Sequence, residues 1–309
     1  MARLGDFLSK QSRFLLENDN QALVYIAVLA VIPFVGWLSA AIVALITLRK
    51  GWYDGLKGMI AGSIALLVLS LMSMSFTAAL LATVMAFLPC YLTAAVLHST
   101  ASWKIAGGLL VLMALLVIAL VHWFAPDFIT GQYQYIQAIL KEIERESTDS
   151  AAVSLLNNQN KLNEVIIANY LVGIQSVSIV LSTLTSLLVA RSMQSRLFYP
   201  GGFKQEMLAF RASGFGVLLL VWAVIGAYQH YPLAISCLPV LVTYYVFAGL
   251  SISFNVLAKD KGLSYLILLV VPLVILPFIM LPIYVILGAL DSLFNFRLYF
   301  SAKSDEKRE

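Results

Sequence analysis

The chain has 309 residues, of which 61% are hydrophobic and 12% are charged, and its formal net charge is +4. Its mean hydropathy is +0.90, and its charges lie in short clusters between long uncharged runs that suit a hydrocarbon core of about 30 Å. This composition excludes a large soluble domain and predicts an all-α, polytopic transmembrane helix bundle. A basic surplus in such a protein reports retention of Lys and Arg on the cytoplasmic side, so it does not indicate nucleic acid.

The N-terminal segment 1–21 has mixed charge and apolar residues along one helical face, which predicts a cytoplasmic amphipathic segment without a cleavable leader. The second and third uncharged runs are continuous and too long for one span, so we expect a break at 73–77. The uncharged runs cover 22–48, 58–77, 78–97, 105–124, 165–190, 212–229, 233–257 and 262–290.

Prolines interrupt the first and last of these runs. Pro33 lies within the first, and Pro272, Pro277 and Pro282 lie within the last. Because proline removes a backbone donor and clashes with the preceding turn, each run is one kinked helix or a hairpin of two short arms. The predicted bundle therefore has eight to ten spans with proline-broken first and last segments.

The distribution of the 20 Lys and Arg residues favours the hairpins. Eight simple spans with a cytoplasmic N-terminus place ten of these residues on each side, whereas two hairpins place 17 inside and 3 outside. The second arrangement follows the positive-inside rule, and it puts both termini on the cytoplasmic side of a bacterial inner membrane. The predicted regions are the transmembrane bundle 22–297, an extracytoplasmic amphipathic loop 125–163, a cytoplasmic loop 191–211 and a charged cytoplasmic tail 298–309.

The sequence shows no pattern of a catalytic or metal site. His98, His122 and His230 stand at span ends without a metal-ligand partner, and the motifs of zinc proteases, serine hydrolases and phosphate loops are absent. No span carries a carboxylate at its middle, as a self-powered proton pump would. Cys90 and Cys237 lie in apolar runs and are predicted to be buried thiols. We expect a protein that is not an enzyme and has no cofactor.

The run 165–190 is the most polar, because amide and hydroxyl side chains recur at i, i+3 and i+7 on one helical face. One interpretation is helix packing by small polar residues. The other is a polar cavity that opens outward. The candidate cavity-lining residues are Trp37, Asn169, Gln175, Ser178 and Ser182.

Two predicted cytoplasmic elements carry more than charge. One joins a basic helix end to a Pro-Gly-Gly turn at 191–206, and the other places Asp291 one helical turn before Asn295. An unpaired charge near hydrocarbon is costly, so we expect Asp291 to pair with Arg297 or with an arginine of another cytoplasmic loop. The alternative is that these residues only mark the point where the last span leaves the membrane. The candidate structural or docking residues are Asp291, Asn295, Arg297, Arg191 and Arg196.

Four stretches together resemble the YybS-like (DUF2232) family of bacterial membrane proteins over nearly the whole chain. They are 33–51, 191–206, 251–262 and 288–297, of which the last is the most specific. That family is distantly similar to the substrate-binding subunits of energy-coupling-factor transporters. The resemblance implies a membrane-embedded binder of a small nutrient that is driven by a separate ATPase module. This chain departs from those subunits in one respect, because its first apolar arm lacks their Ala-x-x-x-Ala contact.

Two functions stay open. The first is a non-enzymatic inner-membrane protein that docks or helps assemble other envelope proteins, which the lack of buried charge and the elaborated cytoplasmic loops favour. The alternative is a small-solute-binding component of a membrane transporter, which the broken first segment and the polar stripe favour. The expected partners are the lipid bilayer together with another membrane protein, an ATPase module or a small molecule, and no nucleic acid.

Overall fold

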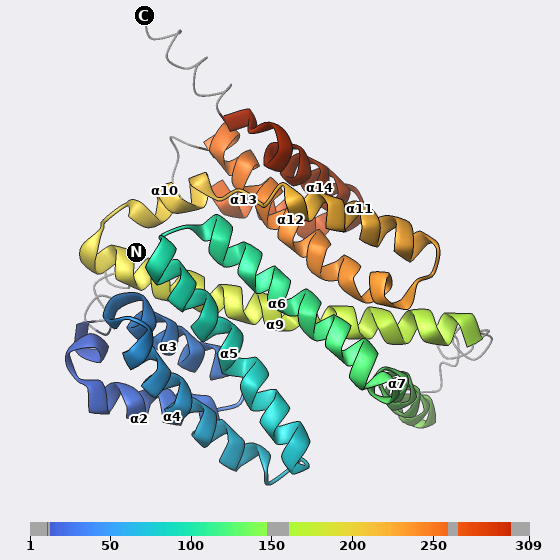
Figure 1. Cartoon of the computed structure of the whole chain (residues 1–309), viewed down its shortest axis with the longest axis horizontal. Coiled ribbons are helices and arrows are strands. Elements are labelled where there is room, and N and C mark those ends of the chain that lie inside the picture. The colour runs from blue at the N-terminus through green and yellow to red at the C-terminus, as the bar shows by residue number, and fades with distance from the viewer. Residues whose placement is uncertain (1–10, 12, 147–160, 259–264, 298–309) are drawn as a thin grey trace, which may run out of the picture.

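A computed structural model describes residues 11, 13–146, 161–258 and 265–297. Within these ranges the chain forms helices and no strand, so the predicted all-α fold is confirmed (Figure 1). Helices long and apolar enough to cross a membrane identify a multi-pass integral membrane protein. Six helices of the described ranges meet this condition: α4 (Trp52–Ser70), α5 (Phe76–Thr100), α6 (Trp103–Phe124), α9 (Lys161–Phe198), α12 (Pro232–Ala258) and α14 (Pro277–Phe294).

The first uncharged run is a hairpin of two short helices, α2 (Asp19–Val31) and α3 (Gly36–Lys50). The turn follows Pro33, and Phe34 adopts a left-handed conformation with φ of 64°. The Ser39 hydroxyl donates a 2.8 Å hydrogen bond to the Ile26 carbonyl, so the two arms lie against each other. The predicted hairpin is confirmed here.

The last run is also a hairpin, formed by α13 (Tyr265–Ile275) and α14, which meet at Leu276. The Tyr284 hydroxyl donates a 2.8 Å hydrogen bond to the Leu269 carbonyl. These residues stand about two helical turns on either side of the break, so that contact requires the arms to fold back on each other. A single kinked helix is thereby excluded. The break expected at 73–77 is also present, because α4 ends at Ser70 and α5 begins at Phe76.

Some predicted loops are helical in the structure. The amphipathic segment after α6 is α7 (Pro126–Glu146), while residues 147–160, most of segment 1–21 and the tail 298–309 lie outside the described residues. The predicted cytoplasmic loop at 191–211 instead continues α9 to Phe198, turns at Gly201 with φ of 89°, and forms the short helix α10 (Gly202–Ala209). A further helix, α11 (Phe215–Tyr228), precedes α12.

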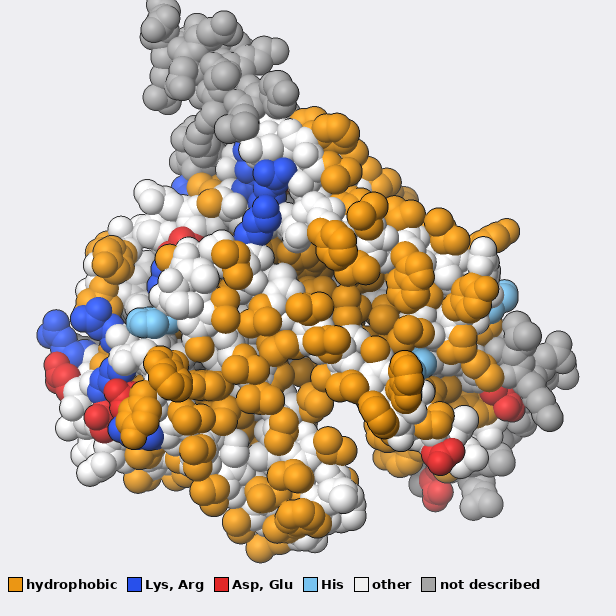
Figure 2. All heavy atoms as spheres, in the orientation of Figure 1, with side chains coloured by type: hydrophobic (Ala, Val, Ile, Leu, Met, Phe, Trp, Pro, Cys, Tyr) orange, Lys and Arg blue, Asp and Glu red, His pale blue; other side chains and the backbone are white. Residues whose placement is uncertain are grey.

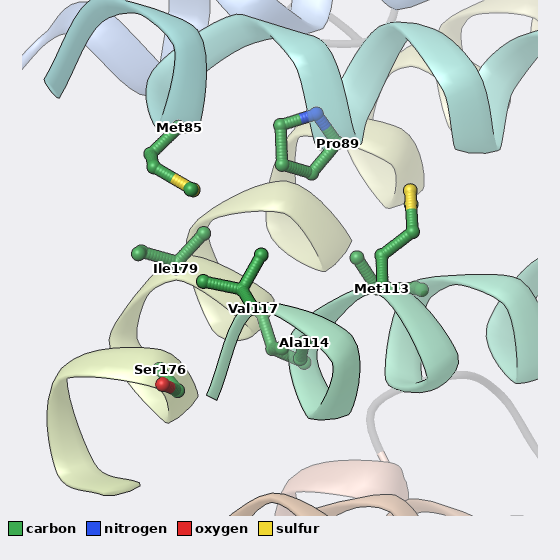
Figure 3. A pocket seen from close by; sticks show the side chains of 9 residues that line it. Met85, Pro89, Met113, Ala114, Val117, Ser176 and Ile179 are labelled. Atoms are coloured by element: carbon green, nitrogen blue, oxygen red, sulfur yellow. The ribbon is translucent and has the colours of Figure 1, made fainter. Parts of the chain in front are cut away.

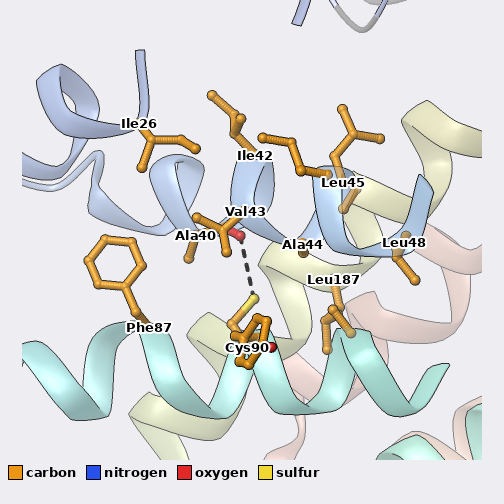
Figure 4. Packing of buried hydrophobic residues seen from close by; sticks show 14 of the residues in the cluster. Ile26, Ala40, Ile42, Val43, Ala44, Leu45, Leu48, Phe87, Cys90 and Leu187 are labelled. Atoms are coloured by element: carbon orange, nitrogen blue, oxygen red, sulfur yellow. Dashed lines mark hydrogen bonds between the residues drawn. The ribbon is translucent and has the colours of Figure 1, made fainter. Parts of the chain in front are cut away.

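The bundle has two halves that share α9. In the N-terminal half, α2, α4 and α5 surround α3, whose residues Ser39 to Leu48 are all buried (Figure 4). The alanines of α3 let these helices approach closely, and the Cys90 thiol lies 3.5 Å from the Ala40 carbonyl. In the C-terminal half, α6, α7, α11, α12 and α14 pack around a second core. Both cores include residues of α9, which therefore holds the halves together.

Contacts gather the basic residues at one end of the bundle, which we call the basic end. The Leu48 carbonyl contacts His98 of α5 at 2.9 Å and Gln194 of α9 at 3.0 Å, so the ends of three helices meet there. Lys50 pairs with Asp19, and the Arg49 guanidinium lies over the Phe198 ring. Toward the opposite end α5 and α6 diverge, and the surface between them is hollowed (Figures 1 and 2).

The contact between α12 and α14 depends on two glycines, and it yields the first test. A Cβ atom at Gly288 would overlap the Tyr245 carbonyl oxygen, and one at Gly249 would overlap the Tyr284 carbonyl oxygen. We expect Gly288→Ala to lower the free energy of unfolding by about 1–3 kcal/mol, because the helices must separate. Gly36→Ala is the matched control, since no atom lies within 4 Å of its Cβ position. Thermal unfolding of both variants checks this, and equal transition temperatures would contradict it.

Candidate functional site: an apolar cavity beneath α10

Gln175, Ser178 and Ser182 lie on one face of α9, and we call them the polar stripe. The stripe has two roles. The Gln175 amide donates a 2.8 Å hydrogen bond to the Gln132 side chain, which ties α7 to α9. Ser178 and Ser182 are exposed and line a hollow of about 350 Å³ against Ala82, Met85 and Ala86 of α5. We call this the surface hollow. Part of the stripe thus connects helices, and part faces a hollow.

The remaining two candidate cavity residues lie elsewhere. Trp37 is 38% exposed, and its carbonyl accepts a 2.7 Å hydrogen bond from the Ser186 hydroxyl, which joins α3 to α9. Asn169 is 2% exposed, and its side-chain oxygen lies 2.8 Å from His122 Nε2. The Ser236 hydroxyl donates to the Asn169 carbonyl at 2.9 Å. The cluster of His122, Asn169 and Ser236 therefore joins α6, α9 and α12.

Three hollows lie in a row along the contact between the two halves. The surface hollow shares Met85 and Ile179 with a middle hollow of about 40 Å³, which also touches Pro89 and Met113 (Figure 3). The middle hollow in turn shares Leu110 and Val180 with a cavity of about 180 Å³, which we call the inner cavity. Because each hollow shares lining residues with the next, the three hollows adjoin one another.

The inner cavity has an almost wholly apolar lining. It lies between α6, α9, α12, α13 and residues 202–210, which comprise α10 and Phe210 and which we call the α10 segment. The side chains that line it include Leu184, Leu188 and Phe247. Its hydroxyl groups already have partners. Thr243 donates to the Pro239 carbonyl at 2.8 Å, and the Tyr244 hydroxyl accepts from the Ser213 amide at 3.0 Å. Such a lining offers an incoming molecule mainly hydrocarbon contact.

The α10 segment closes the inner cavity at the basic end, where Met207 and Phe210 line it. The C-terminal half holds this segment by its backbone. Ser251 donates to the Met207 carbonyl at 2.7 Å and to the Phe210 carbonyl at 2.9 Å, and Asn255 donates to the Leu208 carbonyl at 3.0 Å. These bonds satisfy carbonyls that α10, a helix of two turns, leaves without an internal partner.

The other flank of α10 is held through Glu206. Its carboxylate accepts a 2.8 Å hydrogen bond from Trp103 Nε1 and a 2.9 Å bond from Arg191 Nε. Arg191 also donates to Gln194 at 2.6 Å, and Gln194 reaches the Leu48 carbonyl of α3. Burial acts to raise the pKa of Glu206, but the bonds from Arg191 and Trp103 outweigh it, so the pKa lies below its ordinary value. The carboxylate is therefore charged at neutral pH.

The predicted partnership of Asp291 with Arg297 is confirmed. Asp291 is fully buried, and its Oδ2 accepts a 3.0 Å bond from Arg297 Nε. Arg297 also donates to the carbonyls of Leu208 and Phe210, so this ion pair fastens α10 to the end of α14. Arg211 donates to the Asp291 carbonyl at 2.9 Å.

The other candidates have smaller roles. Asn295 adopts a left-handed conformation with φ of 52° and ends α14, while Arg196 is exposed at the surface. Glu206 and Ser251 were not among the predicted site residues. Their importance depends on the groups that they meet across the bundle, which are side chains for Glu206 and backbone carbonyls for Ser251, and no local spacing encodes that.

Among the residues that the structure describes, no group of three or more His, Cys, Asp or Glu side chains is arranged to hold a metal ion. Cys90 and Cys237 are free, buried thiols, as predicted. No family model, no curated protein and no solved structure matches the chain. The function must therefore be argued from the geometry of the hollows and of α10.

The ion pair under α10 gives the second test. Removing one partner of a buried pair leaves an uncompensated charge, so we expect Asp291→Ala to lower the free energy of unfolding by about 3–5 kcal/mol. The matched control is Asp54→Ala, because Asp54 forms an ion pair with Lys57 at the surface. We expect the control to leave the transition temperature nearly unchanged. Thermal unfolding in detergent compares the two, and equal losses would show that the pair does not fasten the basic end.

Proposed function

We propose that the chain is a non-enzymatic integral membrane protein that binds the apolar chain of a lipid-like small molecule in the inner cavity. The observation that carries this proposal is an apolar space of about 180 Å³ with no unpartnered hydroxyl in its wall. Hydrocarbon from the membrane is the filling that matches its lining.

This proposal develops the solute-binding alternative and changes its chemistry. A polar nutrient needs hydrogen-bonding groups aimed at the ligand, but the stripe residues Gln175 and Ser178 are engaged with Gln132 and the Ile174 carbonyl. A role as a transport component, a link to an ATPase module and membership of the YybS-like family remain proposals that the apolar cavity accommodates. Docking or assembly of envelope proteins remains a prediction from sequence, and no described surface favours it.

We also propose that the basic end faces the cytoplasm of a bacterial inner membrane, because that orientation follows the positive-inside rule. Ser99 is exposed in the last turn of α5, and Ser73 is exposed in the turn that precedes α5, so they stand at opposite ends of the bundle. Single cysteines at these positions, in a background with Cys90 and Cys237 replaced by alanine, are to be treated with an impermeant thiol reagent. In intact spheroplasts we expect labelling at position 73 alone. Labelling at position 99 alone would reverse the orientation.

The binding proposal is tested by filling the cavity. Leu184 lines the inner cavity, whereas Leu181, less than one turn away on α9, is 39% exposed and lines none of the three hollows. We expect Leu184→Trp to displace the bound chain and Leu181→Trp to retain it. The proteins are to be purified in digitonin, a detergent without an alkyl chain. Mass spectrometry of the solvent extract then measures lipid-like molecules per protein.

The same proteins allow a second measurement with added probes. Dodecanol and lauric acid share an apolar chain and differ in charge, so stabilisation by both indicates recognition of the chain. We expect either probe to raise the transition temperature of the Leu181→Trp protein and to leave that of Leu184→Trp unchanged. Equal extracts and equal responses from the two variants would contradict binding in the inner cavity.

A further inference from the structure

The row of hollows leads from the protein surface to the inner cavity, which also adjoins a separate hollow of about 290 Å³ at Val111 and Tyr244. Its first member lies between α5 and α9 and is lined by the exposed residues Ser178 and Ser182. The middle hollow adjoins it at Met85 and Ile179, and the inner cavity begins beyond Leu110 and Val180. The side chains of these shared residues form part of the wall between one space and the next.

The two ends of this row are built differently. At the basic end, α10 is fastened by the buried pair of Asp291 with Arg297 and by the bonds of Glu206 with Arg191 and Trp103. At the other end, the partitions are apolar side chains that contact through dispersion alone. Moving a methionine or valine side chain between rotamers breaks no hydrogen bond, whereas lifting α10 breaks several. The side-chain partitions are therefore the easier barrier to open.

We propose that the apolar chain enters the inner cavity through this row from the end opposite the basic residues, and that Met85 is the side chain that gates its entry. The proposal rests on the proposed function. Met85 touches both the surface hollow and the middle hollow and is half-buried. Methionine is unbranched and flexible, so it yields to a thin chain. The middle hollow has a volume of only about 40 Å³, so side chains must move for a chain to pass.

Met85 is suited to a test because it does not line the inner cavity. Substitutions there change the route and leave the binding site intact. The probe is parinaric acid, an unbranched fluorescent fatty acid. Trp103 in the cavity wall serves as the energy donor, in a background in which the other four tryptophans are replaced by phenylalanine. Stopped-flow energy transfer in digitonin gives the rate of entry, and titration gives the amount bound at saturation.

We expect Met85→Ala to raise the entry rate by about tenfold, equivalent to a barrier lower by about 1.4 kcal/mol, and Met85→Phe to lower it. The amount bound at saturation should stay the same. Asn255→Ala is the matched variant for the other end, because Asn255 holds the Leu208 carbonyl of α10 and lies outside the cavity wall. We expect it to leave the rate unchanged.

The outcomes separate the route from the site. If Asn255→Ala speeds entry and the Met85 variants do not, the chain enters beneath α10 and the inference is overturned, while the proposed binding stands. Saturable energy transfer with equal rates in all variants also overturns it. Absence of saturable energy transfer in the unchanged protein contradicts the proposed function itself.

Discussion

The structure depends on how the basic end pairs a buried carboxylate, one oxygen of which has no hydrogen-bond partner among the described residues, and bonds backbone carbonyls. Asp291 is fully buried, and Arg297 pairs with it while also bonding two carbonyls at the end of α10. An unpaired carboxylate or an open carbonyl at this depth would be costly, so these groups hold each other in a fixed arrangement. The consequence is a short helix fixed across the end of the bundle. Without that arrangement the inner cavity would have no wall on this side.

The same arrangement explains why the two halves behave as one unit at the basic end and separate at the other. Glu206 connects α10 to Arg191 of α9 and to Trp103 of α6, and Gln194 continues the connection to α3. Polar contacts are therefore dense where the halves meet. Toward the opposite end α5 and α6 diverge (Figure 1), and a row of hollows runs along α9 from the inner cavity to the surface. Polar bonds close the inner cavity at the basic end, and packed apolar side chains close it on the other side. A molecule therefore enters more easily through the packed apolar side chains.

Much of the fold could be predicted from the sequence because it follows from local rules. Proline interruptions and the distribution of Lys and Arg predicted both hairpins, and hydropathy predicted the spans. The cost of an unpaired charge predicted an arginine partner for Asp291, and Arg297, which lies close in the chain, was one of the expected partners. The cluster of His122, Asn169 and Ser236 could not be predicted, since its members come from three helices.

The candidate site was predicted only in part for the same reason. The stripe on α9 marked the correct helix, but the spacing of Gln175 and Ser178 does not show that one meets α7 and the other a hollow. Residues 191–211 carried turn signals, and tertiary contacts instead extend α9 and form α10. The inner cavity arises from apolar side chains on five elements, and each of them alone is typical of any membrane helix.

Electron cryomicroscopy of the protein in lipid nanodiscs can show whether an apolar chain occupies the inner cavity while α10 closes its basic end. We expect elongated density between Leu184, Phe247 and Phe210, with Arg297 bonded to the Phe210 carbonyl that follows α10. A cavity collapsed by contact of Leu184 with Phe247, or polar density bound to the hydroxyls of Thr243 and Ser251, would contradict it.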